Sequence, residues 1–146
     1  MSTLSDTAWQ WILSAEGGEV DDPSDRGGHT RYGISANAYP DEDIANLTEA
    51  RARHLYERDY WCKAHCPETP ARIALAHFDA CVNHGVGRAN RLLQKALGVR
   101  VDGLVGPVTL GAVRKAARER LLVQMLGRRA MFYAAIVRND SSQAKY

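Results

Sequence analysis

The 146-residue sequence contains few cysteines and no long hydrophobic run. Its three cysteines, Cys62, Cys66 and Cys81, are too few and odd in number for the disulfide framework of a small secreted domain. Free thiols of this kind fit a reducing compartment better. No apolar run reaches the length of about 18 residues that a membrane-spanning helix needs, and no basic segment precedes the first apolar residues, as it does in a signal peptide. We therefore expect a protein that is made in the cytoplasm without a signal peptide.

The charges of the chain are unevenly distributed, although its net charge is only +2. Residues 1–43 hold nine acidic and two basic residues, whereas residues 114–146 hold eight basic and two acidic ones. Two interpretations of the basic end stay open. It is either a solvated helix face or a surface, with Arg128 and Arg129, that steers the protein towards an anionic cell wall, membrane leaflet or nucleic acid. The length of the chain favours a single domain, residues 1–146, which at this size is stable without a disulfide or a metal.

Hydrophobic residues recur at helical spacing along most of the chain. The first such stretch, with Trp9, Ile12 and Leu13 on one side, has a capping residue at Ser5 or Asp6 and ends before a pair of glycines. Further helices are expected over residues 48–61, 71–83, 86–97 and 107–117, and over a last segment with Leu122, Met125, Leu126, Phe132, Tyr133 and Ile136 on one face. The sequence therefore predicts an all-α or α-dominated α+β fold with six or seven helices. A long loop over residues 17–34 follows the first helix, and any strand in it is short and lies near residues 29–32.

The long loop after the first helix is rich in acidic residues and glycines. Residues 15–35 read AEGGEVDDPSDRGGHTRYGIS and contain five of each. Glycoside cleavage needs one carboxyl group that stays protonated, to donate to the leaving oxygen, and a second group that handles water or stabilises the transition state. The two groups must lie in different environments, one dry and one solvated. The segment is therefore a candidate catalytic loop.

Three residues of this segment fit catalytic roles. Glu16 ends an apolar helix, where its carboxyl group can lie against packed side chains and keep its proton, so it is the candidate general acid. Asp25 lies in a polar, glycine-flanked turn, and the hydroxyl group of Thr30 can hold a water molecule beside it. The alternative interpretation is a solvated turn or a calcium loop, although the spacing of the acidic residues does not follow the EF-hand pattern.

The same segment closely resembles the signature of glycoside hydrolase family 108, the phage-type N-acetylmuramidases that are also described as secretion activators. That signature runs E-G-G and then D-P-x-D-x-G-G-x-T-x-x-G-I. The matching residues are Glu16, Gly17, Gly18, Asp22, Pro23, Asp25, Gly27, Gly28, Thr30, Gly33 and Ile34. The resemblance implies a lysozyme-like fold in which the glutamate of E-G-G, Glu16, is the catalytic residue. By analogy with the Glu, Asp and Thr order of other phage lysozymes, Asp25 and Thr30 would position or activate the attacking water.

Residues 78–113 are similar to the peptidoglycan-binding segment that accompanies this family. We expect a helical binding segment over residues 71–138, packed into the same domain. Its motif D-G-x-x-G-x-x-T, from Asp102 to Thr109, favours a structural role in which these two residues tie a turn to the following helix. Asp79 and Asn83 lie four residues apart on one helix face. They either reach the sugar-binding cleft, as candidate substrate-binding residues, or cap and brace the neighbouring glycine turn.

The resemblance implies a peptidoglycan hydrolase that cleaves the β-1,4 bond between N-acetylmuramic acid and N-acetylglucosamine. Without a signal peptide, it would be released through a holin or another non-classical route, as a phage or prophage endolysin is. Two alternatives stay open, a non-catalytic peptidoglycan-binding or secretion-accessory protein and a lytic transglycosylase. Asp25 and Thr30 can serve water and so favour hydrolysis. We expect a monomer with peptidoglycan as its partner, no nucleic-acid partner and no stable membrane insertion.

The cysteines and one histidine have a metal-binding alternative. Cys62, His65 and Cys66 could form a zinc site if folding brought Cys81 or His84 close as a fourth ligand. Thiols in a reducing compartment are the simpler interpretation, so we expect no metal and no other cofactor.

Three aromatic residues are candidates for stacking on sugar rings. They are Tyr32, Tyr60 and Trp61, and Tyr32 is the candidate substrate-binding residue among them because it lies in the acidic segment. Aromatic residues at helix ends more often belong to the core. The sequence leaves both interpretations open.

Overall fold

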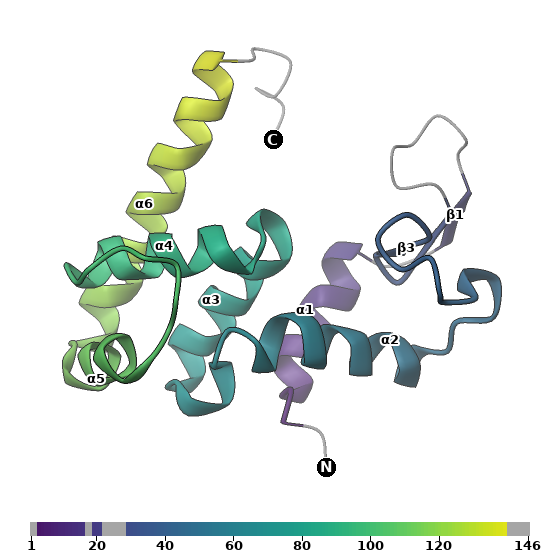
Figure 1. Ribbon diagram of the computed structural model, residues 1–146, viewed down its shortest axis with the longest axis horizontal. Coiled ribbons are helices and arrows are strands. Elements are labelled where there is room, and N and C mark those ends of the chain that lie inside the picture. Colours follow the sequence, from purple (N-terminus) through teal and green to yellow (C-terminus); the bar gives the residue numbers. More distant parts are fainter. Residues whose placement is uncertain (1–2, 17–18, 22–28, 140–146) are drawn as a thin grey trace. The chain divides into compact units, whose positions relative to one another are not determined.

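The chain folds into two compact units, Met1–Cys62 and Lys63–Tyr146. The computed structural model describes residues 3–16, 19–21 and 29–139. Within these residues six α-helices, α1 to α6, dominate the structure, and the β-structure is a small sheet of three strands (Figure 1). The predicted α-dominated fold with six or seven helices is confirmed.

The first unit contains two α-helices, the sheet and two short helical segments. In chain order they are α1 (Asp6–Glu16), β1 (Glu19–Asp21), β2 (His29–Arg31), β3 (Ile34–Ser35), the 3-10 helix η1 (Ile44–Asn46), α2 (Glu49–Tyr56) and the π-helix η2 (Glu57–Cys62). The N-caps of both α-helices are as predicted. The Ser5 hydroxyl accepts a hydrogen bond from the N–H of Ala8 (3.1 Å), and the Thr48 hydroxyl accepts one from the N–H of Arg51 (3.1 Å).

Helix α1 is held against α2 by aromatic and polar contacts. Trp9, which is buried, donates a hydrogen bond from Nε1 to Glu49 Oε1 (2.9 Å), and its ring lies 5.8 Å from the ring of Tyr56. The guanidinium group of Arg53 donates to the Leu4 carbonyl (2.6 Å) near the start of α1. These contacts therefore hold the N-terminal half of α1 against α2.

The three strands form an antiparallel sheet in the order β1-β2-β3. The short strand predicted near residues 29–32 is confirmed as β2. The prediction of loop is wrong for residues 19–21 and for residue 34, since residues 19–21 form β1 and β3 begins at residue 34. Strands of three and two residues are too short for a period-two pattern to appear in the sequence. Both strands pair with β2, which lies between them in the sheet.

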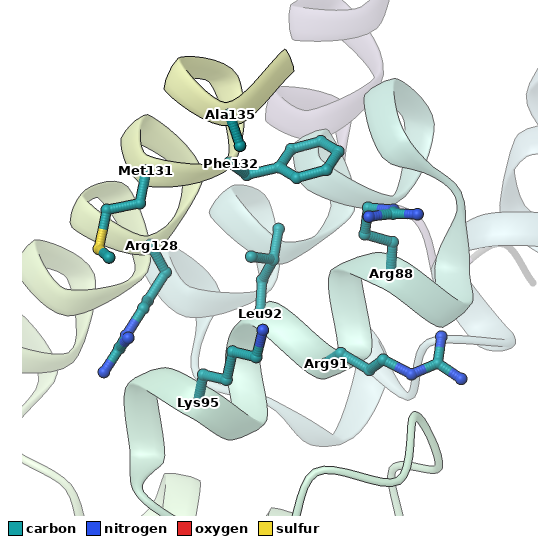
Figure 2. A pocket seen from close by; sticks show the side chains of 8 residues that line it. All are labelled: Arg88, Arg91, Leu92, Lys95, Arg128, Met131, Phe132 and Ala135. Carbon is teal, nitrogen blue, oxygen red and sulfur yellow. The ribbon is translucent and has the colours of Figure 1, made fainter. Parts of the chain in front are cut away.

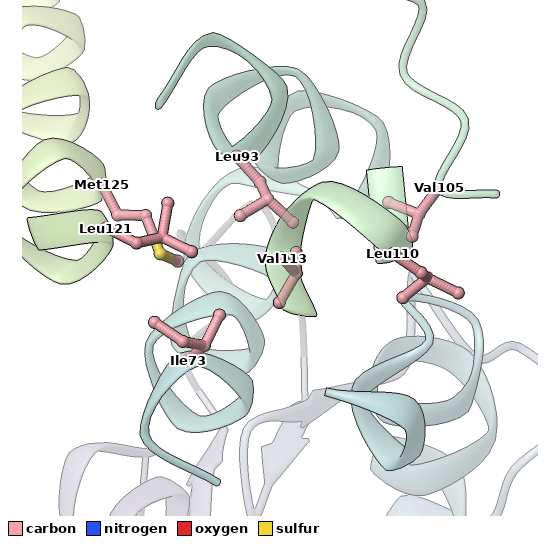
Figure 3. Close-up of a cluster of buried hydrophobic side chains, with 7 residues drawn as sticks. All are labelled: Ile73, Leu93, Val105, Leu110, Val113, Leu121 and Met125. Atoms are coloured by element: carbon pink, nitrogen blue, oxygen red, sulfur yellow. The ribbon is translucent and has the colours of Figure 1, made fainter. Parts of the chain in front are cut away.

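The second unit is entirely helical in its described residues. It contains the 3-10 helix η3 (Cys66–Glu68), α3 (Ala71–His84), α4 (Val86–Leu97), α5 (Pro107–Lys115) and α6 (Arg118–Asn139). Its core brings together side chains from α3, α4, α5, α6 and the segment before α5 (Figure 3), namely Ile73, Leu93, Val105, Leu110, Val113, Leu121 and Met125. Helix α6 packs along α3 and α4.

Two helix predictions need correction. The helix expected over residues 48–61 is α-helical only to Tyr56 and continues as the π-helix η2, a change of hydrogen-bond pattern that local propensity does not reveal. The sequence predicts Leu126 on the same face of α6 as Met125, but Leu126 is 58% exposed, whereas Leu121 is buried. Leu121 and Met125 are four residues apart and share one face, so Leu126 is rotated by about 100° towards solvent.

No helix in the described part of the chain has the length and hydrophobicity that a membrane span requires.

Candidate active site

The candidate general acid, Glu16, is the last residue of α1. Strand β1 begins three residues further along the chain, at Glu19. The side chain of Glu16 lies outside the described part of the structure, as does all of Asp25. The catalytic roles of these two residues therefore stay predictions.

Thr30 lies in the middle of the central strand of the sheet. It is opposite Val20 of β1 and opposite Ser35 of β3, and its side chain is half-buried. Residues that are directly opposite in an antiparallel pair share a face of the sheet. β1 follows α1 after two residues, so Thr30 belongs to the segment that begins directly after Glu16.

Tyr32 occupies the tight turn between β2 and β3. Its backbone is left-handed, with a φ of 53°, and the following Gly33 has a φ of 76°. Two positive φ values in succession are typical of the two-residue turns that match the twist of a hairpin, but the first position is strained for a tyrosine. The carbonyl of Tyr32 accepts a hydrogen bond from the Tyr56 hydroxyl (2.9 Å), which anchors the strained turn to α2.

The side chain of Tyr32 is half-buried and lies beside a cation. The guanidinium carbon of Arg31 is 5.5 Å from the centre of the Tyr32 ring, and its Nη1 donates to the carbonyl of Ala45 (2.8 Å). Arg31 therefore bridges the turn to η1, and Tyr32 is held in place through both its backbone and its ring.

The other two aromatic candidates pack in the interior of the first unit. Trp61 in η2 is only 5% exposed. Tyr60 is half-buried, and its ring lies 5.7 Å from the ring of Tyr56. Nearby, the Tyr39 hydroxyl donates to Asp59 (2.8 Å), and burial together with this hydrogen bond raises the pKa of Tyr39 well above its usual value. Of the three aromatic residues, Tyr32 alone lies in the acidic segment.

Asp79 and Asn83 face each other on α3, as their spacing predicts. The Asn83 amide donates to the main-chain carbonyl (2.8 Å) and the carboxylate (3.3 Å) of Asp79. The Asp79 carboxylate also forms an ion pair with Arg129 of α6 (2.8 Å), and both side chains are mostly buried. Arg129 further donates to His84 Nε2 (3.3 Å). Burial and the adjacent Arg129 lower the pKa of His84, which suits a neutral, accepting ring.

The D-G-x-x-G-x-x-T motif is tied to α4 by one buried amide. Gln94 Oε1 accepts hydrogen bonds from the N–H groups of Asp102 (3.1 Å) and Gly103 (2.9 Å). Gln94 Nε2 donates to the Asp102 carboxylate (2.8 Å) and the Leu104 carbonyl (3.0 Å), and lies 3.3 Å from the Thr109 hydroxyl. Hydrogen bonds from the Leu104 N–H and from Gln94 lower the pKa of Asp102. The motif is thus linked to the preceding helix as well as to α5.

The zinc alternative has no support in the described residues, among which no three His, Cys, Asp or Glu side chains are grouped to hold a metal ion. Cys62 is exposed, whereas Cys66 is buried with its thiol 3.7 Å from the Ala74 carbonyl. The thiol of Cys81 lies 3.9 Å from Nε2 of the buried His77, and burial raises its pKa to about 12.

Sequence reasoning missed the basic face of α4. Arg88, Arg91 and Lys95 line a pocket between α4 and α6, together with Arg128 of α6 (Figure 2). Their spacing of three and four residues places them on one helix face and was visible in the sequence. The uneven distribution of charge in the sequence instead indicates a basic surface within residues 114–146. The structure also separates Arg128, which lines this pocket, from Arg129, which is paired with Asp79.

Two family models match the chain. The model described as Glycosyl hydrolase 108 matches residues 9–85, and the model described as Predicted Peptidoglycan domain matches residues 88–146. Among solved structures, the chain is similar to the one titled "Structure of Brucella abortus SagA", with 34% sequence identity, a TM-score of 0.76, and coverage of 86% of this chain and 77% of that chain. No curated protein matches the chain. These matches confirm the family resemblance and the lysozyme-like fold, and they indicate a peptidoglycan-related function.

Proposed function

We propose, since the chain belongs to the glycosyl hydrolase 108 family, that it is an N-acetylmuramidase. It hydrolyses the β-1,4 bond between N-acetylmuramic acid and N-acetylglucosamine in peptidoglycan. Glu16 is the general acid that protonates the leaving oxygen, while Asp25 and Thr30 position the attacking water. No metal or other cofactor takes part.

The observation that carries this proposal is the position of the E-G-G glutamate. Glu16 is the final residue of a helix whose inner face is buried through Trp9 and Ile12, and the matched family span of residues 9–85 includes it together with Asp25 and Thr30. A carboxyl group at the end of a packed helix can be shielded enough to keep its proton near neutral pH. Thr30 lies in β2, the central strand of the sheet that follows.

Substrate binding is assigned to three residues in this proposal. Tyr32, held rigidly at the β2–β3 turn, offers an aromatic face to a sugar ring. Asp79 and Asn83 contribute polar groups from α3, where the ion pair with Arg129 fixes the orientation of Asp79. The helical segment 71–138 is the part that binds peptidoglycan. The catalytic segment 17–34 belongs to the first unit, and the protein acts as a monomer.

The protein reaches the cell wall, in this proposal, after release by a holin-type or other non-classical route, as an endolysin of a phage or prophage does. A wall-binding or secretion-accessory protein without catalysis is the main competing function. A lytic transglycosylase is the other.

Replacing the general acid tests the proposal. Glu16→Gln keeps the size of the side chain but cannot donate a proton, so we expect lysis of purified cell walls to fall by roughly 10²–10⁴-fold. Glu19→Gln, three residues further along the same segment, is the matched control and should lyse walls at the wild-type rate. Thermal unfolding of all three proteins checks that the fold is kept.

The outcomes separate the competing functions. Wild-type lysis rates in a folded Glu16→Gln variant would reject Glu16 as the general acid. A wild-type protein that binds walls but releases no fragments would be the non-catalytic binder.

A further inference from the structure

A cationic pocket lies between α4 and α6 in the second unit (Figure 2). Its volume is about 490 Å³, within the range of roughly 300–1,000 Å³ that is usual for small-ligand sites. Four of its eight lining residues are cations: Arg88, Arg91 and Lys95 from α4, and Arg128 from α6. The other four are apolar, namely Leu92, Met131, Phe132 and Ala135. The pocket therefore combines positive charge with an apolar floor.

The four cations have no carboxylate of the protein to neutralise them in the described structure. No acidic residue is among those that line the pocket. The ion pairs found among the described residues involve other cations, such as Arg129 of α6, which pairs with Asp79 of α3. Like charges gathered on one concave surface repel each other, and an anionic ligand relieves that repulsion.

The floor of the pocket suits small apolar groups more than flat rings. Phe132 already has the guanidinium group of Arg88 over its ring (4.7 Å to the centroid) and the ring of His84 against it (5.0 Å). A cation and a second ring therefore already contact this aromatic side chain. Met131, which is 64% exposed, and Ala135 offer an aliphatic surface that a methyl group can contact.

We propose that this pocket binds the acidic stem peptide of peptidoglycan, with the four cations holding its carboxylates and the apolar floor receiving its alanine methyl groups. The inference deepens the proposed function and rests on it for the identity of the polymer. Stem peptides contain both alanine residues and residues that carry free carboxylates, which matches the combination of positive charge and apolar surface in the pocket. All eight lining residues fall within residues 88–146, the span that matches the peptidoglycan domain model.

Two other anionic partners fit the pocket less well. Single-stranded nucleic acid binds through aromatic platforms as well as cations, and the aromatic ring here is already covered by Arg88. A membrane surface presents many headgroups to a broad basic face, whereas these cations line a concave pocket. Both partners are included as competitors in the test.

The test measures binding of an N-acetylated stem tetrapeptide, acetyl-L-Ala-γ-D-Glu-meso-diaminopimelate-D-Ala, by calorimetry. We expect the wild-type protein to bind it at least about tenfold more tightly than the same peptide with its carboxylates amidated, because a hydrogen bond between charged groups contributes about 1.5–3 kcal/mol. The variant Arg88→Gln/Arg128→Gln should lose at least about tenfold in affinity. Arg88→Lys/Arg128→Lys should retain most of the affinity, since the charges remain.

A second double variant that removes the same number of positive charges tests whether the loss of affinity is specific to the pocket. Arg118→Gln/Arg138→Gln removes two exposed cations of α6 that do not line the pocket, so its affinity should stay within about twofold of wild type. Equal losses in both double variants would overturn the proposal, as would equal affinity for the amidated peptide. Pocket-dependent binding of phosphatidylglycerol vesicles or single-stranded DNA without binding of the tetrapeptide would also overturn it.

Hydrolysis of peptide-free glycan strands separates this inference from the proposed function. If the wild-type protein binds the tetrapeptide but cleaves no strands, the muramidase proposal fails and the pocket assignment stands. If it cleaves strands but does not bind the tetrapeptide, the pocket assignment fails alone.

Discussion

The side-chain amide of Gln94 lies 2.8 Å from the carboxylate of Asp102, and this contact belongs to a buried network that holds the loop between α4 and α5. Gln94 is only 1% exposed, and it satisfies main-chain groups of Asp102, Gly103 and Leu104 as well. About one turn earlier on α4, Asn90 donates to the Gly103 carbonyl (3.0 Å). Two amides, four residues apart on α4, therefore determine the conformation of the glycine-rich motif.

Removing the Gln94 amide should destabilise the protein strongly. Gln94→Leu leaves two N–H groups and one carbonyl without their partner in a buried site, and each unsatisfied group costs about 1–3 kcal/mol. We expect the free energy of unfolding to fall by about 2–4 kcal/mol in urea denaturation. The exposed Gln124→Leu serves as the control and should change it by less than about 0.5 kcal/mol. Equal effects of the two substitutions would contradict the role of the network.

Acid should destabilise the protein through His77. Asn90 Nδ2 is a donor to Gly103, so Asn90 Oδ1 accepts from His77 Nε2 (2.9 Å), and His77 Nδ1 is a buried acceptor without a partner. Burial lowers the pKa of His77 from 6.5 to about 4. Between these values the unfolded chain binds the proton and the folded protein does not, so stability decreases as the pH falls from about 6.5 to about 4.

The size of this effect is measured by comparing the wild type with His77→Gln at several pH values. A difference of about 2.5 pKa units corresponds to a loss of up to about 3 kcal/mol in the wild type. His77→Gln keeps an amide donor for Asn90 but cannot titrate, so the stability of the variant should decrease less between pH 7 and pH 4. Parallel pH profiles for the two proteins would show that His77 is not the responsible group.

The three cysteines should differ in reactivity. Cys62 is exposed, Cys66 and Cys81 are buried, and burial raises the pKa of Cys81 to about 12, which disfavours its reactive thiolate. We expect a thiol reagent such as DTNB to react rapidly with one thiol in the native protein and with all three after unfolding. Cys62→Ser should abolish the rapid reaction. A second rapid thiol in the native wild type would be inconsistent with the buried positions.

The hydroxyl group of Thr30 should matter for catalysis rather than for folding. Thr30→Val preserves the β-branched shape in the centre of β2 but cannot hold a water molecule, so we expect kcat to fall by about tenfold or more, the scale of one hydrogen bond to a charged group. Thr30→Ser retains the hydroxyl group and should recover most of the activity. If Thr30→Val and Thr30→Ser had the same kcat, Thr30 would have no role in positioning water.

The helices could be predicted from the sequence because their information is local. The hydrophobic spacing around Trp9 and Ile12, and the caps at Ser5 and Thr48, each involve neighbours within one or two turns. Strands β1 and β3 could not be predicted, since two or three residues are too few to show an alternation of apolar and polar side chains. Their pairing with β2 is also a contact between separate strands, which no local pattern reveals. The change to a π-helix after Tyr56 has no local signal either.

The candidate site divides in the same way. The sequence motif identified Glu16 and Thr30 as candidates because their residue types and their spacing match the family signature. In the structure, Glu16 is at the end of α1 and Thr30 is in the central strand. The contacts around Asp79 could not be predicted, because its partner Arg129 is 50 residues away in sequence. The pocket on α4 was missed for a different reason. Its basic residues are interleaved with the apolar stripe that defined the helix, and the stripe was the stronger signal.

The most direct test of the central claim is mass spectrometry of peptidoglycan digested with the wild-type protein and with Glu16→Gln. A muramidase adds water across the β-1,4 bond, so we predict soluble fragments that end in reducing N-acetylmuramic acid from the wild type, and almost none from Glu16→Gln. Fragments that end in 1,6-anhydro-N-acetylmuramic acid would identify a lytic transglycosylase instead. Intact glycan strands after digestion with the wild-type protein would contradict the assignment of hydrolytic activity altogether.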